Sequence, residues 1–178
     1  SGRPSLEKVG VEFTSDVGPY EIMKVRLLNG SHSALSYVSY LMGYRNVDEA
    51  MADPLIRKFV RSYMDNDITP TITAPNGYDL EKYKDTLVER FSNPAISDQV
   101  QRLALDGSQK IRNAIVPPLA SQIASNGSIK YIAFALAGWY RYLTGVDEQG
   151  NAISINDPMS ESLVARAYSS PSDAGQLL

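Results

Sequence analysis

The chain has 178 residues, of which 43% are hydrophobic and 21% charged, a composition typical of a folded globular domain rather than a disordered chain. It contains no cysteine and a single histidine, His32, which excludes disulfides, thiolate nucleophiles, cysteine-bound metals and sites built from several histidines. Twenty acidic residues outnumber seventeen basic ones, and the net charge of -3 disfavours a nucleic-acid-binding protein. The sequence shows neither a long apolar run nor a secretory signal pattern, so we expect a cytoplasmic protein with no membrane partner.

The N-terminal segment differs in pattern from the rest of the chain. Between Leu6 and Phe13, apolar residues alternate with polar or small ones, which is typical of a short strand. From Pro19 onward the apolar residues follow a helical spacing, up to a tail rich in Ser, Pro and Gly. We therefore predict an all-α fold, with a multi-helix domain over residues 19–178 preceded by a vestigial strand within residues 1–18.

Start and stop signals divide the helical part into elements. The first predicted helix is long and covers about residues 20–42, from Pro19 to a terminating glycine, Gly43. Apolar residues from Ile129 to Leu143 recur every three or four positions, which predicts a core helix ended by Gly145. Further helices are predicted to begin at Asp53-Pro54, Asp79, Ser97, Pro117-Pro118 and Asp157-Pro158, with a break at Asp106-Gly107.

Gly30 and the serines that follow it allow two interpretations. A glycine inside a helix costs about 1 kcal/mol relative to alanine, so at Gly30 either a ligand or a neighbouring helix is expected to approach the backbone closely. Four serines follow in the same predicted helix, at Ser31, Ser33, Ser36 and Ser39. Their hydroxyls could face a polar ligand, or the small side chains could allow helices to pack closely.

Three residues of the first predicted helix could carry chemistry. At about 100° per residue, Asn29 lies about 140° from Lys24 around the helix and His32 lies about 80° from it, so all three share one side. An amine can take or release a proton, an amide can donate a hydrogen bond to an oxyanion, and an imidazole can do either. The apolar residues around Lys24 would lower the pKa of the lysine by desolvation. In the alternative interpretation, the lysine is solvated and the histidine is an ordinary core or boundary residue.

Several strings in the sequence resemble one enzyme family. Pro-Tyr-Glu-Ile-Met-Lys at 19–24, Leu-Leu-Asn-Gly-Ser-His at 27–32 and Asp-Gly-Ser-Gln-Lys-Ile at 106–111 are similar to the C-terminal domain of the polyol-specific long-chain dehydrogenases, the mannitol dehydrogenase family. The similarity extends from about Leu6 to the Asp157-Pro158 segment and includes Asn-Pro-Ala-Ile at 93–96 and Gly-Val-Asp-Glu at 145–148. A lysine followed by asparagine five residues later and histidine three after that, behind Pro-Tyr-Glu, is specific for this family.

The resemblance implies a role for six residues. Lys24 matches the general base that removes the proton of a secondary alcohol, Asn29 an asparagine that stabilises the alkoxide, and His32 a histidine that orients the substrate oxygen. Arg102 and Lys110 match basic residues that bind sugar hydroxyls, and Glu21 matches a glutamate that serves proton exit. Without the resemblance, Arg102 and Lys110 would be solvated helix charges, and Glu21 a favourable anion in a first helical turn.

The resemblance also implies a cofactor and a partner domain. The family uses NAD or NADP, held mainly by a Rossmann-type domain that precedes this one in the same parent chain, and this sequence has no Gly-x-Gly-x-x-Gly turn to replace it. Residues 1–18 are therefore predicted to be a remnant of that domain or a linker from it, and the fragment alone is expected to be inactive. No metal is expected, because the lysine and its amide neighbour would do electrostatically what a zinc ion does in other alcohol dehydrogenases.

The expected substrate pair is D-mannitol and D-fructose, interconverted by metal-independent hydride transfer. Fructuronate or tagaturonate reduction is the alternative within the family, but a carboxylate would require a further basic residue that the sequence does not identify. The alternative outside enzymology is a non-catalytic helical interaction module, in which Lys24, Asn29 and His32 are together by accident.

Overall fold

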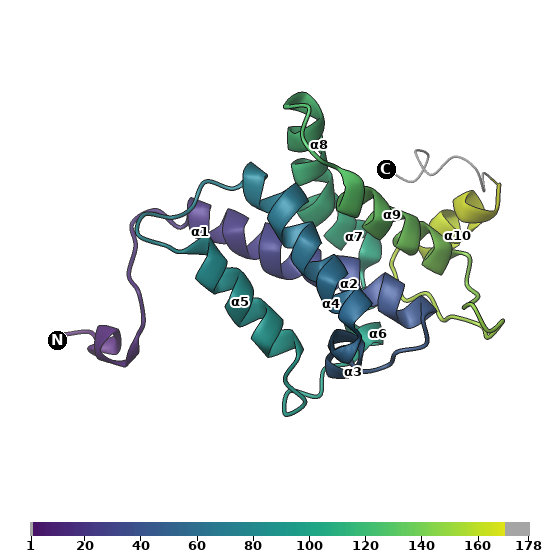
Figure 1. The fold of residues 1–178 in the computed structure, drawn as a ribbon, viewed down its shortest axis with the longest axis horizontal. Helices are drawn as coiled ribbons and strands as arrows, with labels where there is room; N and C mark the ends of the chain where they lie inside the picture. The colour runs from purple at the N-terminus through teal and green to yellow at the C-terminus, as the bar shows by residue number, and fades with distance from the viewer. Residues whose placement is uncertain (1, 170–178) are drawn as a thin grey trace.

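The computed structural model describes residues 2–169 and confirms a mainly helical domain (Figure 1). Its α-helices are α1 (Gly18–Met23), α2 (Gly30–Leu41), α3 (Val47–Ala52), α4 (Pro54–Ser62), α5 (Leu80–Phe91), α6 (Val100–Ala104), α7 (Gly107–Lys110), α8 (Val116–Ala124), α9 (Lys130–Leu143) and α10 (Ser160–Ser169). Three π-helical segments, Lys24–Asn29, Tyr63–Ile68 and Ile111–Ile115, each continue an α-helix without a break. Short 3-10 helices cover Leu6–Val9 and Thr69–Thr71.

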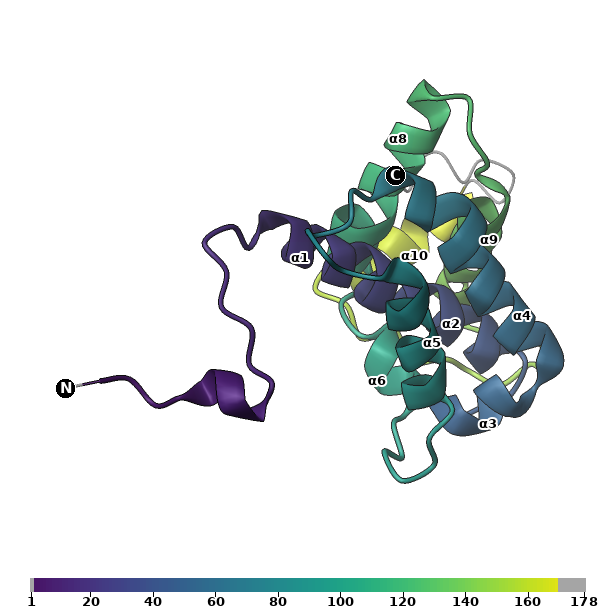
Figure 2. The ribbon, with the colours of Figure 1, turned by 60° about the vertical axis from the view of Figure 1, so that its left-hand side comes forward.

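The predicted N-terminal strand is wrong. Residues Leu6–Val9 form one 3-10 turn, which ends at Gly10 in the left-handed conformation with φ of 88°. All residues from 2 to 17 are exposed, and Figures 1 and 2 show this segment leading away from the helical body. A lone strand needs a neighbour to pair its backbone groups, and no named strand exists in the described part of the chain to supply one.

The long helix predicted over residues 20–42 is confirmed, with a change of winding in its middle. α1, the first π-helical segment and α2 run continuously from Gly18 to Leu41. Within the π-helical segment each backbone N–H reaches one residue further back than in an α-helix, as the Gly30 N–H does with the Val25 carbonyl. This change of winding alters which side chains share a face.

The three π-helical segments meet at Gly30. A Cβ atom at Gly30 would lie 2.7 Å from the hydroxyl of Tyr63 and 3.5 Å from the carbonyl oxygen of Ala114, so that the glycine permits close helix packing. The four serines of α2 (Ser31, Ser33, Ser36 and Ser39) are also fully buried between the packed helices. Of the two interpretations of Gly30 and the serines, the structure therefore supports helix packing.

The capping signals in the sequence locate most helix starts correctly. The carboxylate of Asp53 accepts a hydrogen bond from the Leu55 N–H, and that of Asp79 accepts from Glu81 and Lys82. The prediction at Ser97 is wrong, because α6 begins three residues later, at Val100. Ser97 itself has a left-handed backbone with φ of 50°, which a helical residue cannot have.

Helix α2 is the centre of the core, and α9, α6 and α4 pack against it. The N-terminus of α9 is capped by a residue distant in sequence: the buried carboxylate of Asp67 accepts hydrogen bonds from the backbone N–H groups of Tyr131 (2.6 Å) and Ile132 (2.8 Å) and from the Ser128 hydroxyl (2.6 Å). In the region from residue 2 to residue 169, none of the helices has the length and apolar character needed to cross a bilayer.

Candidate active site

The π-helical segment carries the two ends of the predicted catalytic motif. Lys24 is its first residue and Asn29 its last. Because a π-helix bonds residue i to residue i+5, these two positions lie about one turn apart on one face, closer than the 140° expected for an α-helix. His32 follows three residues later in α2, which places it beside Asn29 on the helix surface. The winding therefore favours convergence of all three side chains on one side.

The structure places Lys24 on the outside of this chain. Its neighbours Met23 and Leu27 point into the core, whereas Lys24 is exposed and Asn29 is half-buried. Among the described residues Lys24 makes no hydrogen bond or ion pair. The desolvation of Lys24 that its apolar neighbours predicted is thus not supplied by residues 2–169.

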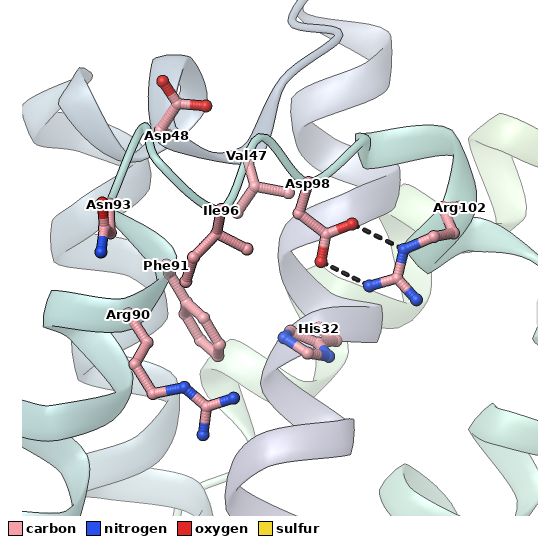
Figure 3. A pocket seen from close by; sticks show the side chains of 9 residues that line it. All are labelled: His32, Val47, Asp48, Arg90, Phe91, Asn93, Ile96, Asp98 and Arg102. Carbon is pink, nitrogen blue, oxygen red and sulfur yellow. Dashed lines mark hydrogen bonds and ion pairs between the residues drawn. The ribbon is translucent and has the colours of Figure 1, made fainter.

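His32 lines a polar pocket of about 210 Å³ (Figure 3). Its imidazole packs against Phe91, with the ring centroids 4.7 Å apart and the planes tilted by 42°. The other residues around the pocket are Val47, Asp48, Arg90, Asn93, Ile96, Asp98 and Arg102. Of the six residues singled out in the sequence, His32 and Arg102 line this pocket, whereas Lys24, Asn29, Lys110 and Glu21 do not.

Burial keeps the imidazole of His32 neutral. The pKa of His32 is lowered to about 4, chiefly by desolvation; Asp98 opposes this change, and the nearby cations Arg102, Lys110 and Arg90 act in the same direction as desolvation. At neutral pH the ring therefore offers one N–H donor and one nitrogen acceptor, the combination needed to orient a hydroxyl group.

The titration of His32 is a direct test of this environment. In the unfolded chain we expect the ordinary pKa of about 6.5, so between pH 6.5 and 4 the unfolded state binds a proton that the folded state does not. Stability should therefore fall by up to about 3 kcal/mol as the pH drops through this window. Because His32 is the only histidine, its imidazole signals in an NMR titration are unambiguous. A His32→Gln variant should lose this acid sensitivity, and a folded-state midpoint near 6.5 would contradict the assigned burial.

Arg102, on α6, is held by an aspartate in the pocket. Its Nε donates a hydrogen bond to Asp98 Oδ1 at 2.6 Å, and its Nη2 contacts Asp98 Oδ2. The pairing raises the pKa of Arg102 and lowers that of Asp98. Figure 3 shows the paired groups beside the His32 ring.

Lys110 ends α7 and lies near the pocket without lining it. Its ammonium donates to the Leu103 carbonyl oxygen at 3.0 Å, and burial lowers its pKa. The turn that carries it is fixed from the far end of the chain, because the Asp157 carboxylate accepts from both the backbone N–H and the hydroxyl of Ser108, each at 2.7 Å. Lys110 is close enough to lower the pKa of His32.

Glu21 lines a different pocket from His32. It is exposed on α1 and lines a second pocket with Ile22, Val25, Arg26, Arg112, Asn113 and Pro117. Glu21 and Lys24 are three residues apart in one continuous helix, which makes them neighbours on its surface. The proton-exit role of Glu21 remains a prediction.

Sequence reasoning missed Asp98 and Arg90. Asp98 precedes Arg102 by four residues, a spacing that brings an acid and an arginine together on a helical turn, and this signal could have found the pair. Arg90 precedes the Asn-Pro-Ala-Ile string by three residues, but only the tertiary structure brings α5 against α2 at His32. Within residues 2–169 no group of three or more His, Asp or Glu side chains is placed to hold a metal ion.

Comparisons with known proteins show the family of this chain. Residues 16–178 match the family model of the mannitol dehydrogenase C-terminal domain. D-mannonate oxidoreductase of Escherichia coli is 45% identical over 159 residues, which cover 89% of this chain and 33% of that protein. Mannitol 2-dehydrogenase of Aspergillus fumigatus is 43% identical over 180 residues, covering 99% of this chain and 36% of the relative.

A solved structure shares the fold. Mannitol 2-dehydrogenase of Pseudomonas fluorescens, in a ternary complex with NAD and D-mannitol, superimposes with a TM-score of 0.84 at 46% identity, covering 97% of this chain and 37% of that one. The chain thus spans only about a third of the length of the relatives it matches. With a family model that matches almost all of its length, this chain belongs to the mannitol dehydrogenase C-terminal domain family.

Proposed function

We propose that this chain is the substrate-binding and catalytic domain of an NAD(P)-dependent polyol dehydrogenase that interconverts D-mannitol and D-fructose. The proposal rests on the π-helical turn between Lys24 and Asn29, whose winding favours a common face for these two residues, with His32 three residues further on. The relatives support the assignment, because one of them is a mannitol 2-dehydrogenase whose structure holds NAD and D-mannitol. A cytoplasmic location belongs to the same proposal.

The cofactor would be held by another domain of the parent protein. Nothing in residues 2–169 forms a strand, turn and helix unit of the kind that binds a dinucleotide. The relatives have about two thirds of their length outside the matched region, which leaves room for such a domain. We propose that residues 1–18 are a remnant of that domain or a linker from it, and that residues 19–178 form the helical domain.

The residues of this chain would act on the proton and the oxygen of the substrate. Lys24, in its neutral form, accepts the hydroxyl proton of the secondary alcohol, while the Asn29 amide donates a hydrogen bond to the developing alkoxide. The neutral imidazole of His32 orients the same oxygen, and Arg102 and Lys110 bind the more distant hydroxyls. When bound by the other domain, NAD would supply the hydride acceptor for the carbon that bears this oxygen.

A neutral lysine requires desolvation that the described residues of this chain do not provide. Lys24 is exposed here, and we propose that the nucleotide-binding domain and the substrate cover it in the assembled enzyme. This arrangement explains why the isolated chain would be inactive even with its residues correctly placed. Glu21, on the same surface, would pass the proton from Lys24 to solvent.

A sugar acid is the second candidate substrate, and a specific residue favours it. Arg90 lines the His32 pocket, and its guanidinium makes no hydrogen bond or ion pair among the described residues. An arginine with free donors is suited to binding a carboxylate. The 45% identity to D-mannonate oxidoreductase is as high as the identity to the mannitol dehydrogenases, so the relatives do not separate the two substrates.

A substrate panel on the full-length protein separates the candidates. We expect NADH formation with D-mannitol and a kcat/KM for D-mannitol at least about 10-fold above that for D-mannonate, equivalent to about 1.4 kcal/mol of transition-state binding. The same substrate panel is repeated with NADP in place of NAD. A higher kcat/KM for D-mannonate would replace the mannitol assignment by the sugar-acid one, and oxidation of neither substrate would overturn both.

A further inference from the structure

Asp98 lies between two residues of the candidate site. Its carboxylate is paired through both oxygens with the guanidinium of Arg102, and it is close enough to His32 to stabilise the protonated ring. Figure 3 shows the carboxylate facing Arg102, with His32 below it on the neighbouring helix. The family resemblance assigned no role to this residue.

Of the two paired groups, Asp98 is the one that the backbone fixes. Its carbonyl oxygen accepts a hydrogen bond from the Val47 N–H at 2.9 Å, and the next residue, Gln99, forms an antiparallel bridge with Asn46. Its side chain is 17% exposed, whereas that of Arg102 is 61% exposed. An exposed arginine samples many rotamers unless a partner holds it, so the pairing restricts Arg102 much more than Asp98.

The pairing leaves one end of the guanidinium free. Nε and Nη2 are occupied by Asp98, and among the described residues Nη1 has no partner. With the two-point contact in place, Nη1 can move only with the whole ion pair, so its two N–H donors have a fixed direction at the edge of the pocket. Fixed donors bind hydroxyl groups with a smaller loss of entropy than mobile ones.

We propose that Asp98 is a positioning residue of this site, which holds Arg102 in the orientation that binds the substrate hydroxyls. The inference rests on the proposed function, since it requires a polyol or sugar-acid substrate at the pocket. The competing explanation is an ordinary exposed ion pair at i,i+4 spacing, which would stabilise α6 slightly and have no effect on the substrate.

A double-mutant cycle in the full-length protein distinguishes the two explanations. With Asp98→Asn we expect the KM for the better substrate to rise about 10-fold while kcat changes by less than about 3-fold, because ground-state and transition-state binding are lost together. Asp98→Glu should recover part of the loss. In an Arg102→Gln background, Asp98→Asn should change KM by less than about 2-fold, because its effect passes through the arginine.

The matched control is Glu7→Gln, which removes a carboxylate that is also paired with an arginine four residues away, Arg3, in the exposed N-terminal segment. It should leave KM unchanged. The inference is overturned if Asp98→Asn leaves KM within 2-fold of the wild type, or if it raises KM equally with and without Arg102. A loss of turnover in Lys24→Ala alongside an unchanged KM in Asp98→Asn would retain the proposed function and reject this inference, whereas a wild type inactive on both substrates would reject both.

Discussion

Replacing Lys24 with alanine in the full-length protein is expected to lower kcat/KM for the polyol by about 10³-fold or more. A positioned general base contributes about 10²-fold to 10⁴-fold, and no other amine lies on the same turn of the π-helical segment. The fold should be unaffected, because Lys24 is exposed and makes no hydrogen bond or ion pair within the described residues. Steady-state rates of NADH formation and a thermal melt check the two halves of this prediction.

Two further variants show what Lys24 contributes. Lys24→Arg keeps the positive charge but cannot give up its proton, so it should be as inactive as Lys24→Ala if the lysine is the base. Lys58→Ala removes an exposed lysine from α4, on the apolar pocket lined by Phe59 and Phe134, and should have normal activity. An active Lys24→Arg variant would show that a fixed cation is sufficient, and an active Lys24→Ala variant would support the non-catalytic interpretation.

The largest effect on stability is expected for Asp67→Ala. The buried carboxylate accepts three hydrogen bonds at the N-terminus of α9, two of them from backbone N–H groups that would be left unpaired in the core. Hydrogen bonds to a charged group contribute about 1.5–3 kcal/mol each and unpaired buried donors add a penalty, so we expect a loss of about 3–5 kcal/mol in the free energy of unfolding. Urea denaturation of the chain measures this loss in the free energy of unfolding.

Asp79→Ala is the matched control for Asp67. Asp79 caps α5 from within its own sequence, and it is exposed, so its removal should cost about 1 kcal/mol. Asp67→Asn keeps an acceptor but loses the charge, and an intermediate loss is expected. If Asp67→Ala were no more destabilising than Asp79→Ala, the long-range cap of α9 would contribute no more to stability than a local cap.

The proposed site joins segments that differ in how firmly they are held. His32 lies on α2, the helix at the centre of the core. Lys110 lies on a four-residue helix that is tied down by Asp157 from the C-terminal part of the chain. The orientation of Arg102 depends on a single carboxylate, that of Asp98. Positioning of the substrate is therefore expected to be most sensitive to changes at Asp98 and Asp157, which support the arginine and the lysine.

The local signals in the sequence were sufficient where a structure depends on neighbouring residues. Capping aspartates and helical periodicity predicted α4, α5 and α9, and the spacing of Lys24, Asn29 and His32 led to the family that the comparisons confirm. The predicted strand is wrong because a strand depends on a second, distant strand to pair with. The alternation in residues 6–13 says nothing about such a partner, and the described residues contain none.

The sequence by itself determined the helical class, most helix starts and the identity of the candidate residues, because these follow from side-chain type and spacing along one helix. Only the tertiary structure decided that the helix around Lys24 is wound as a π-helix, that Gly30 accommodates Tyr63, and that Asp98 and Arg90 join His32 in one pocket. Each of these depends on contacts between segments far apart in the chain, where packing of one helix against another outweighs the local preference of either.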